Sequence, residues 1–371
     1  MLKYLIIYLS FQFYSSKNNL VKVNHEVIAQ NNSQIYHPNS ISNTRKNPKN
    51  IIVGIISRYH WKTVLPFFKS IIESNFNNCD VVMFVRDVSN HLIEKLHKIG
   101  VIVYRIPEKY NNISTINIRW KLYADFLSEN KEYELVFSAD VRDTIFQKNI
   151  FDYYKNNTKF LGVAIEDGLL TEELNKKWVI SVCGTKIYET IMNERIICVG
   201  SIWGTYHEFL EFSNLFYQKL LAYPNSVEQG IANYLFYHEK IFGNYIIKSD
   251  NYGPVMTIGL TNRENIHLDF KDNILNFNGK IAAVIHQYDR KDDIVEIIKK
   301  KYCPELLQSF ISSDENSKKM NEKNIRINET IEFNLIKKIY RSENNILLFY
   351  ESEGLFIILL LIKIKFSSYK L

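Results

Sequence analysis

The sequence contains Leu135-Val136-Phe137-Ser138-Ala139-Asp140-Val141-Arg142-Asp143, in which an apolar run is followed at once by two carboxylates. The apolar run is typical of a buried strand, and the carboxylates then lie on the turn that follows it. Two carboxylates three residues apart on such a turn can converge on one divalent cation. Arg142 between them can contact phosphate or hold one carboxylate in place. The alternative is a helix start, with Asp143 as the N-cap and an Asp140–Arg142 pair on the surface.

Strand and helix signals alternate on the N-terminal side of this stretch. Short β-branched runs, typical of buried strands, are separated by segments with apolar residues at helical spacing. The expected strands are 51–57, 81–85, 101–106 and 134–138, and the expected helices are 61–74, 88–99 and 118–127. This order predicts an α/β, Rossmann-like fold with a mostly parallel central sheet and helices on both faces.

Ligands of such sheets bind outside the carboxyl ends of the strands, and this rule makes candidates of Ser57-Arg58-Tyr59, Arg86-Asp87 and Asp140-Val141-Arg142-Asp143. The first strand is followed by neither a Gly-rich dinucleotide fingerprint nor a lysine-containing phosphate loop, so a diphosphate would have to be bound by other groups. Carboxylates that hold Mg²⁺ or Mn²⁺ are the usual ones, because these ions prefer oxygen ligands. Ser57, Arg58 and Asp87 are therefore candidates for binding a nucleotide donor.

Length and composition limit the classes of protein. The 371 residues are 46% hydrophobic and 23% charged, which is enough for a large core. The net charge of +6 is spread along the chain; it suits an anionic nucleotide, whereas nucleic-acid binders show a clustered basic face, so we expect no nucleic-acid partner. The four cysteines form no CxxC pair and predict either buried thiols or disulfides, with Cys183–Cys198 as the first pair to test.

The two ends of the chain differ from its middle. Residues 1–16 combine a lysine with a mostly apolar run, which predicts a cleaved signal peptide or short signal anchor, the alternative being a buried strand. Residues 17–50 are expected to form a polar stem, residues 51–310 the catalytic domain, and residues 311–371 a polar linker with a hydrophobic tail too short to span a bilayer. With four N-x-[ST] sequons, these features predict a glycoprotein of the secretory pathway, in the ER or Golgi lumen or secreted, with membrane association through the N-terminal segment.

Residues 136–151 resemble a motif of known enzymes. They follow the pattern D-x-[RD]-D-[VT]-[IV]-F-Q-x-[DN]-[PI]-F of a group of eukaryotic glycosyltransferase-like proteins with a nucleotide-diphospho-sugar transferase fold. In the wider GT-A class the corresponding element is the DxD motif, whose acidic groups hold Mn²⁺ and the donor diphosphate. Arg142 stands where a plain DxD has its second aspartate, so the resemblance implies that Asp143 serves beside Asp140.

Other segments between about residues 50 and 300 are similar to the same class. Arg119 opens the helix before the motif strand, where such enzymes often place a basic residue near the donor. Cys198-Val199-Gly200-Ser201 takes the place of a glycine-bearing turn beside the donor sugar, without the commoner N-x-G form. Glu228-Gln229 resembles the start of a D-Q-x-x-x-N element, and His286 corresponds to the third metal ligand of several retaining enzymes. The alternative for each is a core residue or a solvated helix residue.

The resemblance implies a hexosyltransferase-like glycosyltransferase that moves a sugar from a nucleoside diphosphate sugar to a carbohydrate or glycoconjugate acceptor. Asp140, Asp143 and His286 would hold Mn²⁺ or Mg²⁺, and Arg142 would help to neutralise the leaving diphosphate. The candidates for a catalytic carboxylate are Glu166, Asp167 and Glu228. Glu166 and Asp167 end the expected strand 161–165 and either face the acceptor or begin a helix. The rival classes are an inactive sugar-binding protein of the same fold and a nucleotidyltransferase, which would need a phosphate loop after the first strand.

Overall fold

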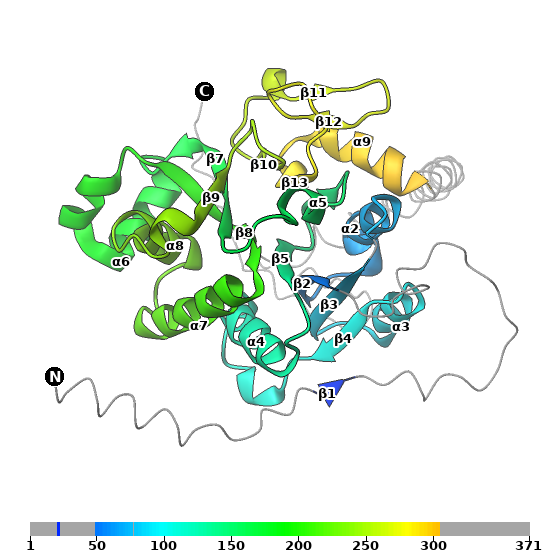
Figure 1. The fold of residues 1–371 in the computed structure, drawn as a ribbon, viewed down its shortest axis with the longest axis horizontal. Helices are drawn as coiled ribbons and strands as arrows, with labels where there is room; N and C mark the ends of the chain where they lie inside the picture. The colour runs from blue at the N-terminus through cyan, green and yellow to red at the C-terminus, as the bar shows by residue number, and fades with distance from the viewer. Residues whose placement is uncertain (1–20, 23–48, 77, 305–371) are drawn as a thin grey trace, which may run out of the picture. The chain divides into compact units, whose positions relative to one another are not determined.

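The computed structural model describes residues 21–22, 49–76 and 78–304, all of which belong to one compact unit that ends at Pro304 (Figure 1). The expected signal segment, most of the expected stem and the C-terminal linker and tail lie outside the described residues. Among the described residues, no helix is both long enough and apolar enough to cross a membrane.

A mixed sheet forms the centre of this unit, and six of its ten strand pairings are parallel. The spatial order is β1-β4-β3-β2-β5-β8-β7-β10-β13-β6, with β9 paired to β7 off this path. The strands are β1 (Val21–Lys22), β2 (Asn50–Ser57), β3 (Cys79–Arg86), β4 (Ile102–Arg105), β5 (Leu135–Asp140), β6 (Thr144–Phe146), β7 (Leu161–Leu169), β8 (Arg195–Thr205), β9 (Ile246–Ser249), β10 (Val255–Thr257) and β13 (Val284–His286). The four strands predicted from the sequence are confirmed as β2 to β5, each within two residues at either end.

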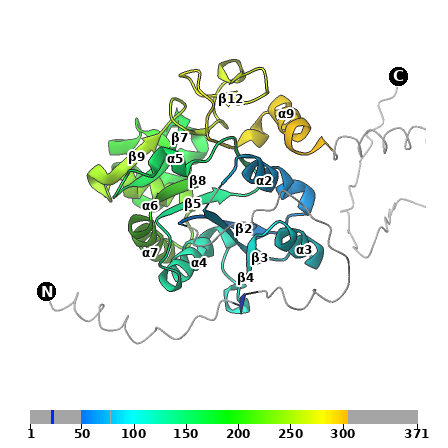
Figure 2. The ribbon, with the colours of Figure 1, turned by 45° about the vertical axis from the view of Figure 1, so that its right-hand side comes forward.

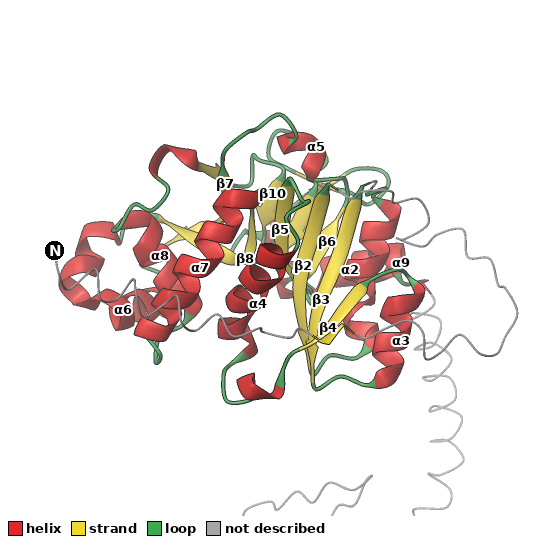
Figure 3. Ribbon diagram, turned by 60° about the horizontal axis from the view of Figure 1, so that its bottom comes forward, coloured by secondary structure: helices red, strands yellow, loops and turns green. Residues whose placement is uncertain are grey.

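Helices cover both faces of the sheet (Figure 3). They are α2 (Trp61–Glu73), α3 (Asn90–Lys98), α4 (Thr115–Glu129), α5 (Phe151–Tyr154), α6 (Glu173–Ile191), α7 (Tyr206–Ala222), α8 (Glu228–Tyr237) and α9 (Asp292–Tyr302). Successive residues of β2 point to opposite faces, so Ile51 and Val53 pack in one core with α4, α6, α7 and α8, whereas Ile52 and Ile56 pack in the other with α2, α3 and α5. The predicted α/β fold is therefore confirmed.

The strands that follow β2 in the sequence are added on both sides of it. The chain first builds β3 and β4 on one side of β2, and after α4 it returns to add β5 on the other side. In α/β sheets, ligands bind outside the carboxyl ends of the strands at the point where the strand order reverses in this way, which here is the end of β2 and β5. The Asp140 turn lies at this end of β5, so the topology places it at the position where α/β sheets bind ligands.

A small hairpin and four short 3₁₀ turns complete the described chain. The hairpin β11 (His267–Leu268) and β12 (Ile274–Leu275) lies beside α9 (Figure 1 and Figure 2). Lys301 on α9 donates to the side chain of Asn273 in this hairpin, and Arg263 pairs with Asp293. The 3₁₀ turns are Glu108–Tyr110, Gly243–Tyr245, Arg263–Asn265 and Tyr288–Arg290. The last of them follows β13 directly and therefore borders the same sheet edge as His286.

Aromatic side chains fill the core between α4, α7 and α8. The ring of Phe212 lies 5.2 Å from that of Trp120, 5.0 Å from Phe216 and 5.6 Å from Phe236, measured between centroids. All four side chains are buried. Because Arg119 and Trp120 are adjacent on α4, this packing also fixes the helix that carries a predicted site residue.

We expect Phe212→Ala to lower the free energy of unfolding by about 3–5 kcal/mol, because it removes a buried ring and leaves a cavity. Leu221→Ala is the matched control: Leu221 lies near the end of the same helix, is 58% exposed, and should cost less than about 1 kcal/mol. Denaturant unfolding measures both values. Similar costs for the two variants would show that the aromatic cluster does not stabilise this face.

Candidate active site

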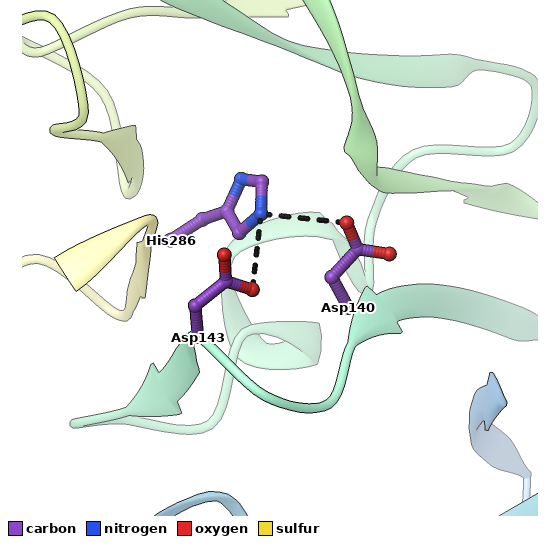
Figure 4. Close-up of side chains that lie close together, drawn as sticks. All are labelled: Asp140, Asp143 and His286. Atoms are coloured by element: carbon purple, nitrogen blue, oxygen red, sulfur yellow. Dashed lines mark ion pairs between the residues drawn. The ribbon is translucent and has the colours of Figure 1, made fainter. Parts of the chain in front are cut away.

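Three potential metal ligands converge at the carboxyl edge of the sheet. Asp140 ends β5, Asp143 directly precedes β6, and His286 ends β13. The Nε2 atom of His286 lies 3.8 Å from Oδ2 of Asp140 and 3.6 Å from Oδ1 of Asp143 (Figure 4). One ligand atom from each residue lies within 4.8 Å of the others. The fold thus brings together the three residues predicted as metal ligands, although His286 lies more than 140 residues after Asp143 in the sequence.

Asp143 does not cap a helix, so that alternative is wrong. The residues after it form β6, which pairs antiparallel with β13 and places Thr144 opposite His286. Arg142 also pairs differently from the surface pair with Asp140: its Nη2 lies 3.2 Å from Oδ2 of Asp143 and 3.2 Å from Oδ2 of Asp289. The strand pairing, and not a helix, therefore fixes the acidic turn against the histidine.

The three side chains fit a divalent cation. His286 is 1% exposed, yet its Nε2 has no hydrogen-bond partner among the described residues. A buried polar atom without a partner is costly, and a metal ion at that nitrogen would satisfy it. Two carboxylates and one imidazole form a ligand set that Mn²⁺ accepts, with oxygen ligands that also suit Mg²⁺.

Gly200 leaves room for this cluster. A Cβ atom on Gly200 would lie 2.5 Å from Nε2 of His286 and 2.8 Å from Oδ2 of Asp140. Cys198-Val199-Gly200-Ser201 is not the turn that the resemblance implied, because it lies inside β8. Opposite it, Val163 pairs with Ile202 and Ala164 with Cys198, so residues 199–201 bulge away from β7. Such a bulge changes the direction of a strand locally, and here it brings the backbone of Gly200 close to the side chains of His286 and Asp140.

The charges in the cluster shift one another's pKa values. Burial raises the pKa of Asp140, but Arg119 and then His286 outweigh it, and the pKa lies below its ordinary range. Burial raises the pKa of Asp143, and His286 offsets only part of that rise. Burial lowers the pKa of His286, but Asp143 and Asp140 reverse the shift and raise it. The two carboxylates therefore attract positive charge to the point between them.

Arg119 supports the cluster from within the protein. It is 4% exposed, and its guanidinium donates to Oδ1 of Asp140 at 2.5 Å and to Oε1 of Glu228 at 2.6 Å. The indole of Trp120 donates to the other oxygen of Glu228 at 3.0 Å. Arg119 and Glu228 are thus tied to each other in the interior, and a direct contact of Arg119 with the donor, which the resemblance implied, is not what this geometry provides. Burial raises the pKa of Glu228 to about 7, since Arg119 offsets only part of it.

Glu166 and Asp167 neither end a strand nor begin a helix, because β7 continues to Leu169. The β7–β8 register shifts between Ile165 and Leu169, and Arg195 of β8 clamps this irregular stretch by donating to the carbonyl oxygen of Glu166 at 3.0 Å. Glu166 is buried and accepts from Nε2 of Gln229 at 3.3 Å; its pKa is raised by burial. Asp167 is exposed, with an oxygen 3.6 Å from Nη2 of Arg195.

A pocket lies along the same edge, at the ends of β2 and β3. This pocket of about 380 Å³ is lined by Ser57, Arg58, Arg86 and residues 111–115, which lead into α4. Arg86 is held by the carbonyl oxygens of Tyr110 and Ile113, at 3.0 and 2.9 Å. The exposed pair Arg58–Asp87 lies at its rim, with 3.3 Å between Nε and Oδ2. The pocket is polar and carries two cationic side chains, as an anionic ligand requires.

Several residues that face the site are absent from the sequence predictions. They are Gln287 beside His286, Arg195 beneath Glu166, and Asp289 beside Arg142. Gln287 and Asp289 belong to the segment that carries His286, which was a signal that could have found them. Cys183 and Cys198 are free cysteines, so the disulfide alternative for this pair is wrong.

No protein-family model matches the sequence, and no curated protein matches it. Among solved structures, the chain is similar to the galactosyltransferase LgtC in complex with donor and acceptor sugar analogs (13% identity, TM-score 0.43), covering 67% of this chain and 95% of that one. The active-site mutant Q189E of LgtC gives 12% identity, a TM-score of 0.43 and the same coverage. The glycosyltransferase GlyE of Streptococcus pneumoniae TIGR4 is 13% identical, with a TM-score of 0.42, and the match covers 72% of this chain and 64% of that one. These neighbours are glycosyltransferases, but identities and TM-scores this low carry no information about activity.

We expect Gly200→Ala to weaken Mn²⁺ binding by at least about 10-fold, because the added methyl group would push His286 and Asp140 apart. Gly243→Ala is the control: no atom lies within 4 Å of the added group, and the strain that it causes at φ 47° is confined to the turn Gly243–Tyr245, which holds none of the metal ligands. Electron paramagnetic resonance of free Mn²⁺ measures both affinities. An unchanged affinity in Gly200→Ala would mean that the ion does not bind between these side chains.

We expect Glu228→Gln to flatten the dependence of stability on pH between about pH 4.5 and 7. In this window folded Glu228, with its pKa raised to about 7 from 4.5, keeps a proton that the unfolded chain has lost. Its contribution to stability is therefore full below pH 4.5 and is lost as the pH rises through 7. The unfolding free energy of the wild type should fall relative to that of the variant by up to about 3 kcal/mol across the window. Urea unfolding at several pH values checks this, and a constant difference would contradict it.

Proposed function

We propose that this protein is a metal-dependent glycosyltransferase that moves a sugar from a nucleoside diphosphate sugar to a carbohydrate or glycoconjugate acceptor. The observation that carries the proposal is the convergence of Asp140, Asp143 and His286 at the ligand-binding edge of the sheet. The nearby pocket lined by Arg58 and Arg86 supports a nucleotide there. The N-terminal apolar segment supports a location in the secretory pathway.

In this proposal Asp140, Asp143 and His286 hold Mn²⁺ or Mg²⁺, which when bound supplies positive charge to the donor diphosphate. Arg142 is 41% exposed in its side chain, so it can add a second positive charge from the solvent side. Ser57, Arg58 and Arg86 bind the nucleoside end in the pocket, with Asp87 as the partner that orients Arg58. These groups together stabilise the charge that develops as the glycosidic bond breaks.

The three carboxylates that the sequence offers as catalytic groups differ in what their surroundings permit. Glu228 is occupied by Arg119 and Trp120, so it acts through Arg119 as a positioning residue. Glu166 is buried with a raised pKa, whereas Asp167 is exposed beside Arg195. A carboxylate with a raised pKa suits proton transfer near neutral pH, so Glu166 is the better candidate for a general base. Gly200, Ser201 and Gln229 line the stretch between the metal ligands and Glu166, and we assign them to the donor sugar.

The test is thermal unfolding of the full chain with UDP, GDP, ADP or CDP, each with and without Mn²⁺. A nucleotide at 100 times its Kd should stabilise the protein by about 2.7 kcal/mol, which raises the melting temperature by several degrees. Asp143→Asn should abolish the Mn²⁺-dependent part of this shift, because it removes a ligand and its charge. Asp152→Asn is the control, since Asp152 is exposed on α5.

Absence of any Mn²⁺-dependent shift in the wild type would contradict the metal site. Catalysis is checked by hydrolysis of nucleoside diphosphate sugars in the presence of Mn²⁺. Without an acceptor, a glycosyltransferase can transfer the sugar slowly to water. Binding without hydrolysis of any donor would instead favour a sugar-binding protein that lacks catalysis.

A further inference from the structure

The thiol of Cys198 lies against the imidazole that carries the free nitrogen. Its Sγ is 3.5 Å from Nδ1 of His286, on the side of the ring away from Asp140 and Asp143. Both side chains are buried, with 3% and 1% of their surfaces exposed. Cys198 opens the segment that the resemblance places beside the donor sugar, yet its side chain turns to the histidine.

This contact determines which nitrogen of His286 can bind a metal. A neutral imidazole carries one proton, and the nitrogen that binds a metal must be the one without it. If Nε2 faces the metal between Asp140 and Asp143, the proton must lie on Nδ1 and needs an acceptor there. The sulfur of Cys198 lies within reach of Nδ1 and is the acceptor that the described part of the chain supplies.

The thiol has a second partner that fixes its own direction. It is hydrogen-bonded to the side chain of Glu166, whose Oε1 also accepts from Nε2 of Gln229 at 3.3 Å and lies 3.5 Å from Nε2 of Gln287. A carboxylate is an acceptor only, so the S–H group donates to Glu166. The sulfur accepts from Nε2 of Gln287, which lies 3.8 Å away, and its other lone pair remains for the imidazole N–H. The hydrogen bonds then run in one direction, from His286 through Cys198 to Glu166.

The backbone on both sides of Cys198 is held in place by α8. The side chain of Asn233 accepts from the amide of Ile197 at 2.8 Å and donates to its carbonyl oxygen at 3.0 Å. Gln229 accepts from the amide of Val199 at 3.2 Å. These bonds flank Cys198, so its Sγ has a fixed place relative to the imidazole.

We propose that Cys198 is a positioning residue that holds His286 in the tautomer with a free Nε2 and links that metal ligand to Glu166. The inference rests on the proposed metal site. Metal-binding histidines commonly donate their other N–H to a carboxylate or carbonyl group, and here a thiol stands between the imidazole and the carboxylate. Changes to such partners typically weaken metal binding by about 10–100-fold.

The test is the Mn²⁺ affinity of the full chain, measured by electron paramagnetic resonance without any donor. Cys198→Ala should weaken binding by about 10–100-fold, because Nδ1 loses its acceptor. Cys198→Ser should bind within about 3-fold of the wild type, because the hydroxyl can accept from Nδ1 and donate to Glu166. Cys183→Ala is the matched control, since this cysteine lies on α6 away from His286, and its affinity should not change. If Cys198→Ala does not fold, as judged by circular dichroism, Cys198→Val replaces it.

A double-mutant cycle separates this chain of hydrogen bonds from general packing. Glu166→Met removes the acceptor oxygens and should weaken Mn²⁺ binding in the wild type but have little further effect in Cys198→Ala. Equal affinities of Cys198→Ala and the wild type, a serine variant as weak as the alanine variant, or equal effects of Glu166→Met in both backgrounds would overturn the inference. If the wild type itself does not bind Mn²⁺, the proposed metal site fails and the role of Cys198 falls with it.

Discussion

The buried guanidinium of Arg119 is the interaction on which the site depends. It joins Asp140 at the end of β5 to Glu228 at the start of α8, and it is carried by α4. The pair with Glu228 is buried on both sides, and removing one member of such a pair leaves an uncompensated charge that typically costs about 3–5 kcal/mol, so α4 and α8 are bound together tightly. One oxygen of Asp140 faces Arg119 and the other faces His286. Arg119 therefore orients the carboxylate without occupying the side that faces the metal position.

The charges around this core leave a deficit of positive charge. Arg119 and Arg142 together face four carboxylates, those of Asp140, Glu228, Asp143 and Asp289. Burying more anions than cations is unfavourable unless another positive group is present. Protonation of His286 or of Glu228 reduces the deficit, in line with the raised pKa of each. A divalent cation would remove it more completely, which is why the electrostatics agree with the ligand geometry.

How much of this follows from the sequence depends on the range of the interactions. The strands β2 to β5 were predictable because continuous apolar runs report burial directly. Asp140 and Asp143 were predictable because a polar turn after such a run lies at the ligand-binding edge. Glu166 was misplaced as a strand end because a bulge, which no local pattern reveals, lets β7 continue past it. The contacts of Arg119 and Cys198 could not be predicted from the sequence either, because each is made with a partner more than 20 residues away.

The site residues follow one another in a fixed order along the carboxyl edge of the sheet. Arg86 ends β3 and Ser57 ends β2, Asp140 ends β5, Gly200 lies in β8, and Glu166 lies in β7, and these strands are consecutive neighbours. Along these five strands the pocket thus comes first, Asp140 next, and the buried carboxylate of Glu166 after it. A nucleoside diphosphate sugar has its parts in the same order, with the diphosphate between the nucleoside and the sugar. Laid along this edge, it would place its phosphates at Asp140 and its sugar over Gly200 toward Glu166, where only a residue without a side chain leaves room beside the metal ligands.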